Sequence, residues 1–261
     1  MTSPITPRVA VVVFPGTNCE LDVVRAVEHV GGSAELLWHG DASIGACDAV
    51  VVPGGFAHGD YLRTGAIARF SPVMGAVAAF AAEGGPVVGI CNGFQVLTEA
   101  GLLPGALQKN TGLRFLCQTV ELRVESTRSV LTRLASVGDV LRVPINHFEG
   151  NYVCSPDDLR RLRDEDRVVV RYVDNPNGSL DDIAGISNGA GHVVGLMPHP
   201  ERASDVILGS DDGVVLLRSL LASAGRSLAE GSERPVRSGT QPTVRSGTQP
   251  ALRSGTQPVS A

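Results

Sequence analysis

Short apolar runs alternate with helical patterns through the first half of the chain, and this alternation limits the fold more than any other feature. The apolar runs cover residues 8–14, 34–38, 48–55 and 86–90. Helical spacing covers residues 19–32, 71–85, with Ser71 as N-cap and Pro72 first in the helix, and 92–100. Continuous apolar strands are typical of a parallel sheet covered on both faces. The pattern therefore predicts an α/β protein with three α/β/α layers and a mainly parallel sheet.

The second half of the chain predicts a different arrangement of strands. Strand-like stretches cover residues 115–124, 167–173, 181–187 and 192–198. The turn sequences NPNGS and NGAG join the last three, which indicates an antiparallel meander added to the parallel strands. A final helix is expected at 212–225.

Composition changes sharply beyond about residue 225. The sequence RSGTQP occurs three times with a period of eight, starting at Arg237, Arg245 and Arg253. These units are too short and too polar to bury a core of their own. We therefore predict one domain over residues 1–227 and a disordered, low-complexity tail over 228–261, for which a docking role stays open.

Charge and cysteine content exclude several classes of function. A net charge of −5 and a pI near 5.7 give no basic field for a nucleic acid or an anionic membrane. No apolar run approaches the roughly 20 residues of a membrane span, and the N-terminus has no secretory signal pattern. The five cysteines form no C-x-x-C pair, so neither a disulfide framework nor a metal site is expected. A cytoplasmic protein with reduced thiols is the simplest interpretation.

Cys91 stands where a buried strand is expected to turn into a helix, in the sequence Gly89-Ile90-Cys91-Asn92-Gly93. This is a cysteine counterpart of the G-x-S-x-G nucleophile elbow, which pushes the central side chain into a pocket. The glycines let neighbouring backbone pass close by, and the helix N-terminus favours a thiolate. The N–H of Asn92 would face a developing oxyanion. The alternative is a buried structural thiol on a tight turn, and the other four cysteines are expected to be ordinary core or surface residues.

Two of the six histidines lie in H-x-E triplets, where the glutamate could orient the imidazole as a base. These are His147 with Glu149 and His199 with Glu201. The spacing favours His199 because it ends an apolar strand and has a proline on each side. His147 lies in what reads as a loop, INHFEGNY, and could instead line the pocket.

A glycine pair, Gly54-Gly55, ends the third predicted strand and could direct backbone N–H groups at an oxyanion together with Asn92. A plain tight turn is the alternative. The chain has no G-x-x-x-x-G-K-[ST] phosphate loop and no dinucleotide fingerprint after its first strand.

Three of these motifs, in this order, carry a resemblance: PGG at 53–55, GICNGFQ around Cys91, and PHPE at 198–201. Together they resemble the class I, or triad, glutamine amidotransferases. The stretches VVVFPGTNCELD, PGGFAHGDYLRTGAIARFSP and NHFEGNY are similar to one branch of that family, the glutaminase subunits of phosphoribosylformylglycinamidine synthase in purine biosynthesis. The similarity covers about residues 8–223.

The resemblance implies a role for each matching residue. Cys91 would be the nucleophile, His199 the general base and acid, and Glu201 the residue that orients His199. The oxyanion hole and substrate contacts would come from Gly54, Gly55, Asn92 and Gln95. The resemblance also decides for His199 over His147, and it implies a flavodoxin-like sheet with an antiparallel extension.

The implied activity is hydrolysis of glutamine to glutamate and ammonia through a cysteine thioester. Free ammonia would be protonated and wasted, and the chain has no recognisable ATP site. The resemblance therefore implies a large synthetase partner, with a small third subunit in many bacteria. No cofactor is expected on this chain, and ATP and magnesium are expected on the synthetase only.

Three alternatives stay open at this point. One is another class I amidotransferase, such as those serving pyridoxal phosphate, histidine or tryptophan synthesis. Another is a cysteine protein of the same fold that acts as a chaperone or removes aldehydes, although such proteins lack the late H-P-E element. A binding module with a degenerate site is disfavoured because every triad position is filled.

Overall fold

The computed structural model describes residues 6–230, and its strands and helices alternate as the first half of the sequence predicts. The strands are β1 (Arg8–Val13), β2 (Ser33–Trp38), β3 (Ala49–Val52), β4 (Val87–Ile90), β5 (Ala106–Gln108), β6 (Leu116–Val124), β7 (Val140–His147), β8 (Asn151–Val153), β9 (Val168–Tyr172), β10 (Ile183–Ser187) and β11 (Val193–Leu196). The α-helices are α1 (Glu20–His29), α2 (Pro72–Ala82), α3 (Asn92–Glu99), α4 (Pro156–Asp164) and α5 (Val214–Glu230).

Nine strands form one mixed sheet in the order β2-β1-β3-β4-β11-β10-β9-β6-β7. The first five are parallel to their neighbours, and from β11 onward every pair is antiparallel. β11 belongs to both halves, since it pairs with β4 in parallel and with β10 in antiparallel fashion. The parallel half has the flavodoxin-like strand order. The predicted α/β/α fold with an antiparallel extension is confirmed.

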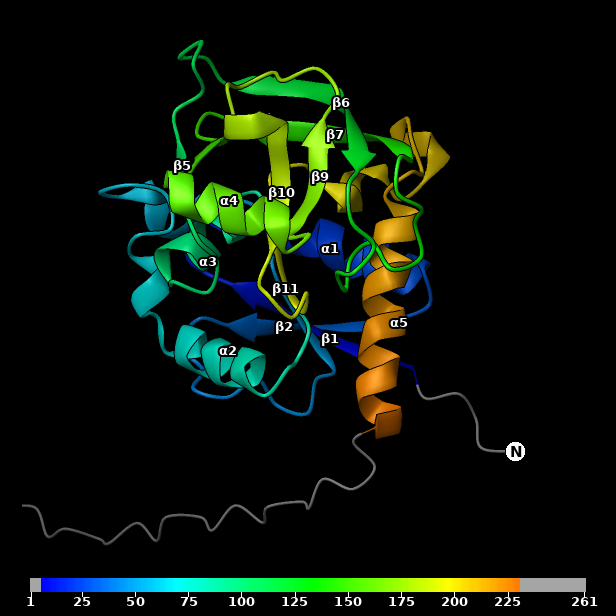
Figure 1. Cartoon of the computed structure of the whole chain (residues 1–261). Coiled ribbons are helices and arrows are strands. Elements are labelled where there is room, and N and C mark those ends of the chain that lie inside the picture. The colour runs from blue at the N-terminus through cyan, green and yellow to red at the C-terminus, as the bar shows by residue number, and fades with distance from the viewer. Residues whose placement is uncertain (1–5, 231–261) are drawn as a thin grey trace, which may run out of the picture.

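Helices cover both faces of the parallel half of the sheet (Figure 1). α1 and α5 lie on one side, where a Cβ added at Gly32 would touch both Val27 and Leu221. α2 and α3 lie on the other side. This is expected because crossover connections are right-handed, so helices that lead from β1 toward opposite edges of the sheet cover opposite faces. Strands β3, β4 and β11 are buried along their whole length, as the continuous apolar runs predicted. β2 is largely exposed because it is the edge strand.

The sequence did not predict β5, β7, β8 or α4. β7 is the other edge strand, and its Pro144 pairs with Thr119 of β6. Edge strands tolerate proline, but a proline in the sequence argues against a strand, and β7 was missed for that reason. α4 is short and highly charged, with Leu162 as its buried residue. Its N-cap is Ser155, whose hydroxyl accepts from the N–H of Asp158 at 3.0 Å. The expected loop at His147 is wrong, because that residue ends β7.

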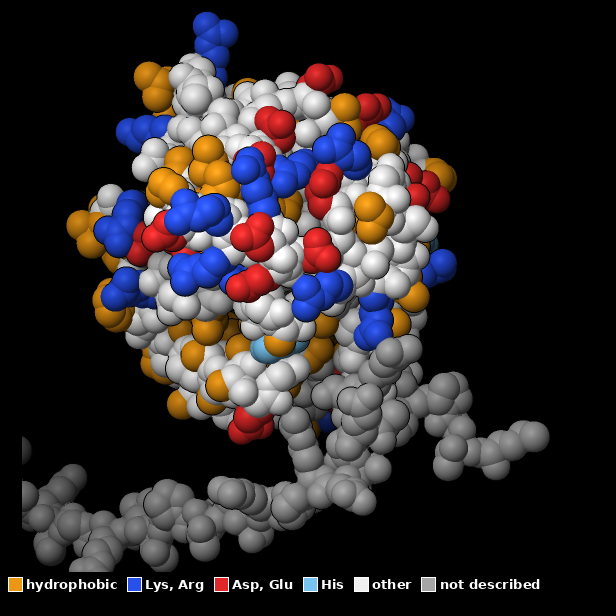
Figure 2. Space-filling view, in the orientation of Figure 1, with side chains coloured by type: hydrophobic (Ala, Val, Ile, Leu, Met, Phe, Trp, Pro, Cys, Tyr) orange, Lys and Arg blue, Asp and Glu red, His pale blue; other side chains and the backbone are white. Residues whose placement is uncertain are grey.

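Basic and acidic side chains alternate over the face shown in Figure 2, around α4 and the strands beside it. Many of them are paired: Arg163 contacts Asp181 at 2.6 Å and Arg161 contacts Asp158 at 2.5 Å. Mixed charge of this kind offers no anion-binding surface on this face.

Among residues 6–230, no helix combines the length and the apolar character needed to cross a bilayer. The predicted tail lies outside the described residues except for positions 228–230, which belong to α5.

Candidate active site

Cys91 occupies a sharp turn between β4 and α3. Its backbone has φ 51° and ψ −106°, in the positive-φ region that non-glycine residues rarely adopt. Such strain persists only where surrounding structure holds it, and here the N–H of Cys91 donates to the carbonyl of Leu196 on β11 at 2.8 Å. The turn has the backbone of a nucleophile elbow, as the sequence predicted.

The two glycines of the elbow are required because backbone passes directly against them. A Cβ at Gly93 would lie 1.8 Å from the carbonyl oxygen of Val52, and one at Gly89 would lie 2.6 Å from the carbonyl oxygen of Gly93. Both distances are far below any real contact, so α3 can approach β3 and β4 this closely only with glycine at both positions.

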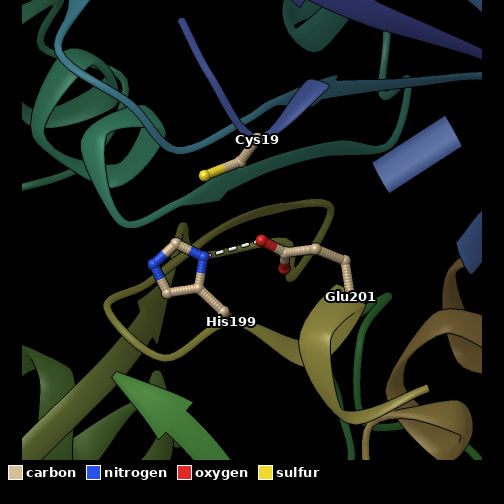
Figure 3. Close-up of side chains that lie close together, drawn as sticks. All are labelled: Cys19, His199 and Glu201. Atoms are coloured by element: carbon tan, nitrogen blue, oxygen red, sulfur yellow. Dashed lines mark hydrogen bonds and ion pairs between the residues drawn. The ribbon is translucent and has the colours of Figure 1, made fainter. Parts of the chain in front are cut away.

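His199 and Glu201 form a buried pair at the carboxyl end of β11 (Figure 3). His199 Nδ1 lies 2.6 Å from Glu201 Oε1, and the two residues are 1% and 2% exposed. Pro200 begins a 3-10 helix (Pro200–Ala203), which brings both side chains to one side of the backbone. The N–H of His199 also donates to the carbonyl of Pro144 on β7 at 2.8 Å, so the antiparallel extension helps to fix the imidazole.

Cys91 and His199 meet over the open face of Gly54. A Cβ at Gly54 would lie 2.8 Å from His199 Cε1 and 3.5 Å from Cys91 Cβ, so only glycine leaves room for both side chains. Burial lowers the pKa of His199, but the negative charges of Glu201 and Cys91 outweigh it and raise that pKa well above 6.5. Nε2 of His199 is buried and has no hydrogen-bond partner within residues 6–230. The pair is therefore arranged to hold a proton next to the Cys91 sulfur.

Gly55 lines the same cavity as Cys91, and Asn92 follows Cys91 as the first residue of α3, so both carry backbone N–H groups in the segments around the thiol. Gly55 has φ 143°, and a Cβ there would lie 2.7 Å from the N of Asn18, so the loop after β3 needs glycine. In the part of the chain that the structure describes, no other residue accepts a hydrogen bond from either N–H. Free N–H groups on a strand-end loop and a helix N-terminus can stabilise an oxyanion.

Hydrogen bonds among side chains make the loops around Cys91 rigid. Asn92 Oδ1 accepts from the N–H of Ala57 at 3.0 Å, and its Nδ2 donates to Gln95 Oε1 at 2.8 Å. Gln95 Nε2 in turn donates to the carbonyl of Glu149 at 2.5 Å. The amide of Gln95, proposed from the resemblance as a substrate contact, thus also ties α3 to the 146–150 segment.

A cavity of about 490 Å³ opens onto Cys91, a volume that suits a small polar ligand. Its charged lining comes from Asp60, Arg63, Lys109 and Glu149, and its neutral lining includes Gly55, Gln95 and His147. Burial raises the pKa of Asp60 to about 6. Gly55 and Gln95, proposed for the oxyanion hole and substrate contacts, thus line the same cavity as Cys91.

A larger cavity of about 560 Å³ lies on the far side of Glu201. It is bounded by α1 and the 200–208 segment and is lined by Asp22, Arg25, Arg202 and Asp205 among others. None of its lining residues is a cysteine. The smaller cavity, which contains the elbow thiol, is the one suited to nucleophilic chemistry.

His147 lies beside the pair without belonging to it. It is 3% exposed, lines the Cys91 cavity, and neither ring nitrogen has a hydrogen-bond partner within residues 6–230. Burial, together with the charge of His199, lowers the pKa of His147 to about 4. His147 is therefore neutral at physiological pH.

This depressed pKa predicts a specific acid sensitivity. Between pH 6.5 and 4, His147 is protonated in the unfolded chain but not in the folded chain. Its contribution to the free energy of unfolding is therefore fully present above pH 6.5 and is lost as the pH falls toward 4. His147→Asn should remove this loss, on the order of 3 kcal/mol of unfolding free energy. Urea unfolding at pH 7 and pH 4 measures it, with exposed His29→Asn as the control. An equal acid loss in wild type and His147→Asn would contradict the prediction.

Cys19 is the residue that sequence reasoning missed. It is buried, as a core residue would be, and it also lies at the N-terminal end of α1 beside His199 and Glu201 (Figure 3). Its N–H donates to the carbonyl of Gly54 at 3.3 Å, and Arg202 Nη2 donates to its sulfur at 3.2 Å. Within the described residues, Cys19, His199 and Glu201 form the one cluster with the spacing of metal ligands. Only its position directly after the first strand, where parallel sheets place their sites, could have singled it out.

Comparison with known proteins agrees with this geometry. Residues 6–211 match the CobB/CobQ-like glutamine amidotransferase domain. The phosphoribosylformylglycinamidine synthase subunit PurQ of Rubrobacter xylanophilus is 58% identical over 217 residues, which cover 83% of this chain and 99% of that protein. The subunit PurQ of Koribacter versatilis is 50% identical over 229 residues, covering 84% and 99%.

A solved structure of PurLQS from Thermotoga maritima contains a chain with the same fold. It is 40% identical, superposes with a TM-score of 0.78, and the match covers 84% of this chain and 99% of that one. Fold, site geometry and sequence identity agree, and the chain belongs to the CobB/CobQ-like glutamine amidotransferase family, in the branch of the phosphoribosylformylglycinamidine synthase glutaminase subunits.

Proposed function

We propose that this glutamine amidotransferase supplies ammonia to a phosphoribosylformylglycinamidine synthetase, and that Cys91, His199 and Glu201 are its catalytic residues. The observation that carries the proposal is the strained elbow that holds Cys91 at a cavity and against the buried His199–Glu201 pair. A thiol that only filled core volume would need none of this arrangement.

The first half of the reaction forms a thioester. The Cys91 sulfur attacks the side-chain carbonyl carbon of glutamine, and the oxyanion that develops accepts hydrogen bonds from the N–H groups of Gly55 and Asn92. His199 then gives its Nε2 proton to the leaving nitrogen. The C–N bond breaks, ammonia leaves and a γ-glutamyl thioester remains. Glu201 stabilises the charged imidazole and holds its orientation through Nδ1.

The second half returns the enzyme to its starting state. His199 takes a proton from water, the resulting hydroxide attacks the thioester, and the C–S bond breaks to release glutamate. The imidazole recovers its proton and Cys91 its negative charge, so no net acid or base is consumed by the triad. Buried His199, which no solvent proton reaches readily, can alternate in this way between the two steps.

The charged lining of the Cys91 cavity matches the main-chain groups of an amino acid. Asp60 and Glu149 supply carboxylates to the lining, and Lys109 and Arg63 supply cations, of which Arg63 is already paired with Glu99 at 2.6 Å. Glutamine carries an ammonium and a carboxylate on its α-carbon, so both can be paired while the side-chain amide reaches Cys91. We assign Glu149 to the ammonium because Asp60 is already held by Asn92 Nδ2 at 3.2 Å.

Glu149→Gln should therefore weaken glutamine binding and leave the chemistry in place. Its KM for glutamine is expected to rise about tenfold, while kcat stays within about twofold of wild type. This is the effect expected when one charge-assisted hydrogen bond to the substrate is lost. Glu121→Gln, an exposed change on β6, is the matched control. Steady-state glutaminase kinetics separates the two parameters. A fall in kcat at unchanged KM would place Glu149 in the chemical step and contradict the assignment.

Covalent labelling tests the nucleophile directly. A chloroketone analogue of glutamine should modify the wild-type chain once, at Cys91, and peptide mapping identifies the site. Cys91→Ala should take up no label, whereas Cys117→Ala, which removes an exposed thiol, should react like wild type. Label found at another cysteine, or its absence from wild type, would overturn the proposed role of Cys91.

The family assignment also supports a proposal about partners. A large synthetase subunit would receive the ammonia and use ATP and magnesium to convert formylglycinamide ribonucleotide to formylglycinamidine ribonucleotide, and a small third subunit would complete the assembly. We propose no cofactor, nucleic acid or membrane for this chain itself, and a cytoplasmic location. Co-purification of untagged synthetase with the tagged chain tests the assembly.

A further inference from the structure

A second thiol lies against the buried histidine–glutamate pair. Cys19 is 2% exposed, and its sulfur faces His199 and Glu201 from the start of α1 (Figure 3). The sulfur, an imidazole nitrogen and a carboxylate oxygen of these residues all lie within 4.8 Å of one another. The proposed hydrolysis of glutamine uses His199 and Glu201 but gives the Cys19 sulfur no task.

One buried oxygen in this cluster is left without a donor. Glu201 Oε1 contacts His199 Nδ1, but Glu201 Oε2 has no hydrogen-bond partner anywhere in residues 6–230. The Glu201 side chain has 0% of its surface exposed. An unpaired carboxylate oxygen at such depth is costly. A cation next to Oε2 would compensate it.

The three residue types match one cation in particular. Cysteine sulfur, histidine nitrogen and glutamate oxygen are ligands of Zn²⁺, whereas Mg²⁺ and Ca²⁺ prefer oxygen alone. A tetrahedral zinc ion holds its ligand atoms roughly 3.3–3.8 Å apart. Small side-chain movements of about 1 Å bring atoms now within 4.8 Å to that spacing. Solvent can occupy the fourth position.

The cluster lies beside a second cavity, and a cation that enters from it must displace the side chains that cover Glu201, whose own side chain is 0% exposed. Glu201 lines the 560 Å³ cavity that lies away from the Cys91 pocket, and the carboxylates of Asp22 and Asp205 line the same cavity. Asp22 also balances Arg202, contacting its Nε at 3.3 Å, so the guanidinium that donates to Cys19 adds little net positive charge. A divalent cation can approach from this side with the substrate pocket filled.

We propose that Cys19, His199 and Glu201 form a Zn²⁺ site whose occupation reversibly inhibits the glutaminase. The metal takes the place of the proton on His199 Nδ1, and the thiol proton of Cys19 passes to solvent. With Nδ1 on a cation, the Nε2 proton could leave only by forming an imidazolate, so His199 no longer donates the proton that ammonia release requires. Inhibition then follows from loss of the general acid, with Cys91 unmodified.

Co²⁺ bound to the full chain tests the site, because cobalt–thiolate absorption reports the sulfur ligand without any turnover. Wild type and Cys91→Ala should both show the thiolate band at one equivalent of Co²⁺, and excess Zn²⁺ should displace it. Cys19→Ala and Cys19→Ser should lose the band and bind Co²⁺ at least about 100-fold more weakly. Mutating a residue that only hydrogen-bonds to a metal ligand already lowers metal affinity about 10–100-fold, and here a ligand itself is removed. Cys117→Ala, at an exposed thiol, should behave as wild type.

Inhibition by Zn²⁺ gives the second readout. The concentration for half-inhibition of glutamine hydrolysis should rise at least about 100-fold in Cys19→Ser relative to wild type. If Cys91→Ala lost the band and Cys19→Ala kept it, the thiolate ligand would be Cys91 and the proposal would be overturned. The absence of any band in wild type would also overturn it. The band in Cys91→Ala does not depend on glutamine hydrolysis, so a failed metal site and a failed glutaminase assignment give different results.

Discussion

Cys91→Ala is expected to abolish glutamine-dependent amidation by the assembled synthase, with a loss of at least about 10⁴-fold, while amidation driven by ammonium salts continues within about twofold. The loss follows from the missing nucleophile, since no other thiol lines the 490 Å³ cavity. The fold should survive, because the hydrogen bond that the Cys91 sulfur donates to the carbonyl of Asn146, at 3.7 Å, is weak. Alanine adopts the positive φ of 51° no less readily than cysteine does.

The measurement compares two nitrogen sources on one preparation of the complex. Product formation is followed with glutamine and then with an ammonium salt at a pH where free ammonia is present. Cys117→Ala is the matched control, and it should keep both activities because the thiol is exposed and is not among the residues that line the cavity. A variant lacking Cys91 that still used glutamine would refute the thioester mechanism. Loss of both activities would indicate a disrupted complex, which a sedimentation profile detects.

Gly93→Ala is expected to destabilise the domain by about 3 kcal/mol or more and to lower glutaminase activity with it. The new Cβ would lie 1.8 Å from the carbonyl oxygen of Val52 and 2.6 Å from its carbonyl carbon. Both atoms are backbone of β3, which is buried in the sheet and cannot move aside as a side chain could. The first turn of α3 must therefore shift, and it carries Asn92 and the elbow with it.

Gly75→Ala is the control for this change. Gly75 is also helical, in α2, but nothing lies within 4 Å of a Cβ there. Alanine is the better helix former by about 1 kcal/mol, so this variant should be slightly more stable than wild type. Urea unfolding of both variants gives the comparison. Equal midpoints for Gly93→Ala and wild type would show that the backbone does not approach as closely as described.

Local physical signals in the sequence predicted the parallel half of the fold and the elbow at Cys91, whereas the resemblance supplied the roles of His199 and Glu201. Local signals there are strong: valine runs buried on both faces, and glycines placed where backbone passes against Cys91. The sequence did not predict β7, because Pro144 interrupts the alternating pattern of a strand at the edge of the sheet. His147 was therefore expected in a loop, although it is a buried strand residue beside the His199–Glu201 pair.

What the sequence by itself determined is the order of strands and helices in the parallel half, the elbow at Cys91 and, through its motifs, the family. Only the tertiary structure placed Cys19 beside His199 and left Glu201 Oε2 without a donor. Motifs report residues that are neighbours along the chain or share a recognisable pattern. Cys19 and Glu201 are brought together by the pairing of β1, β3, β4 and β11, whose carboxyl ends meet at one edge of the sheet. Contacts of that kind depend on distances across the folded core, and no local pattern in the sequence encodes them.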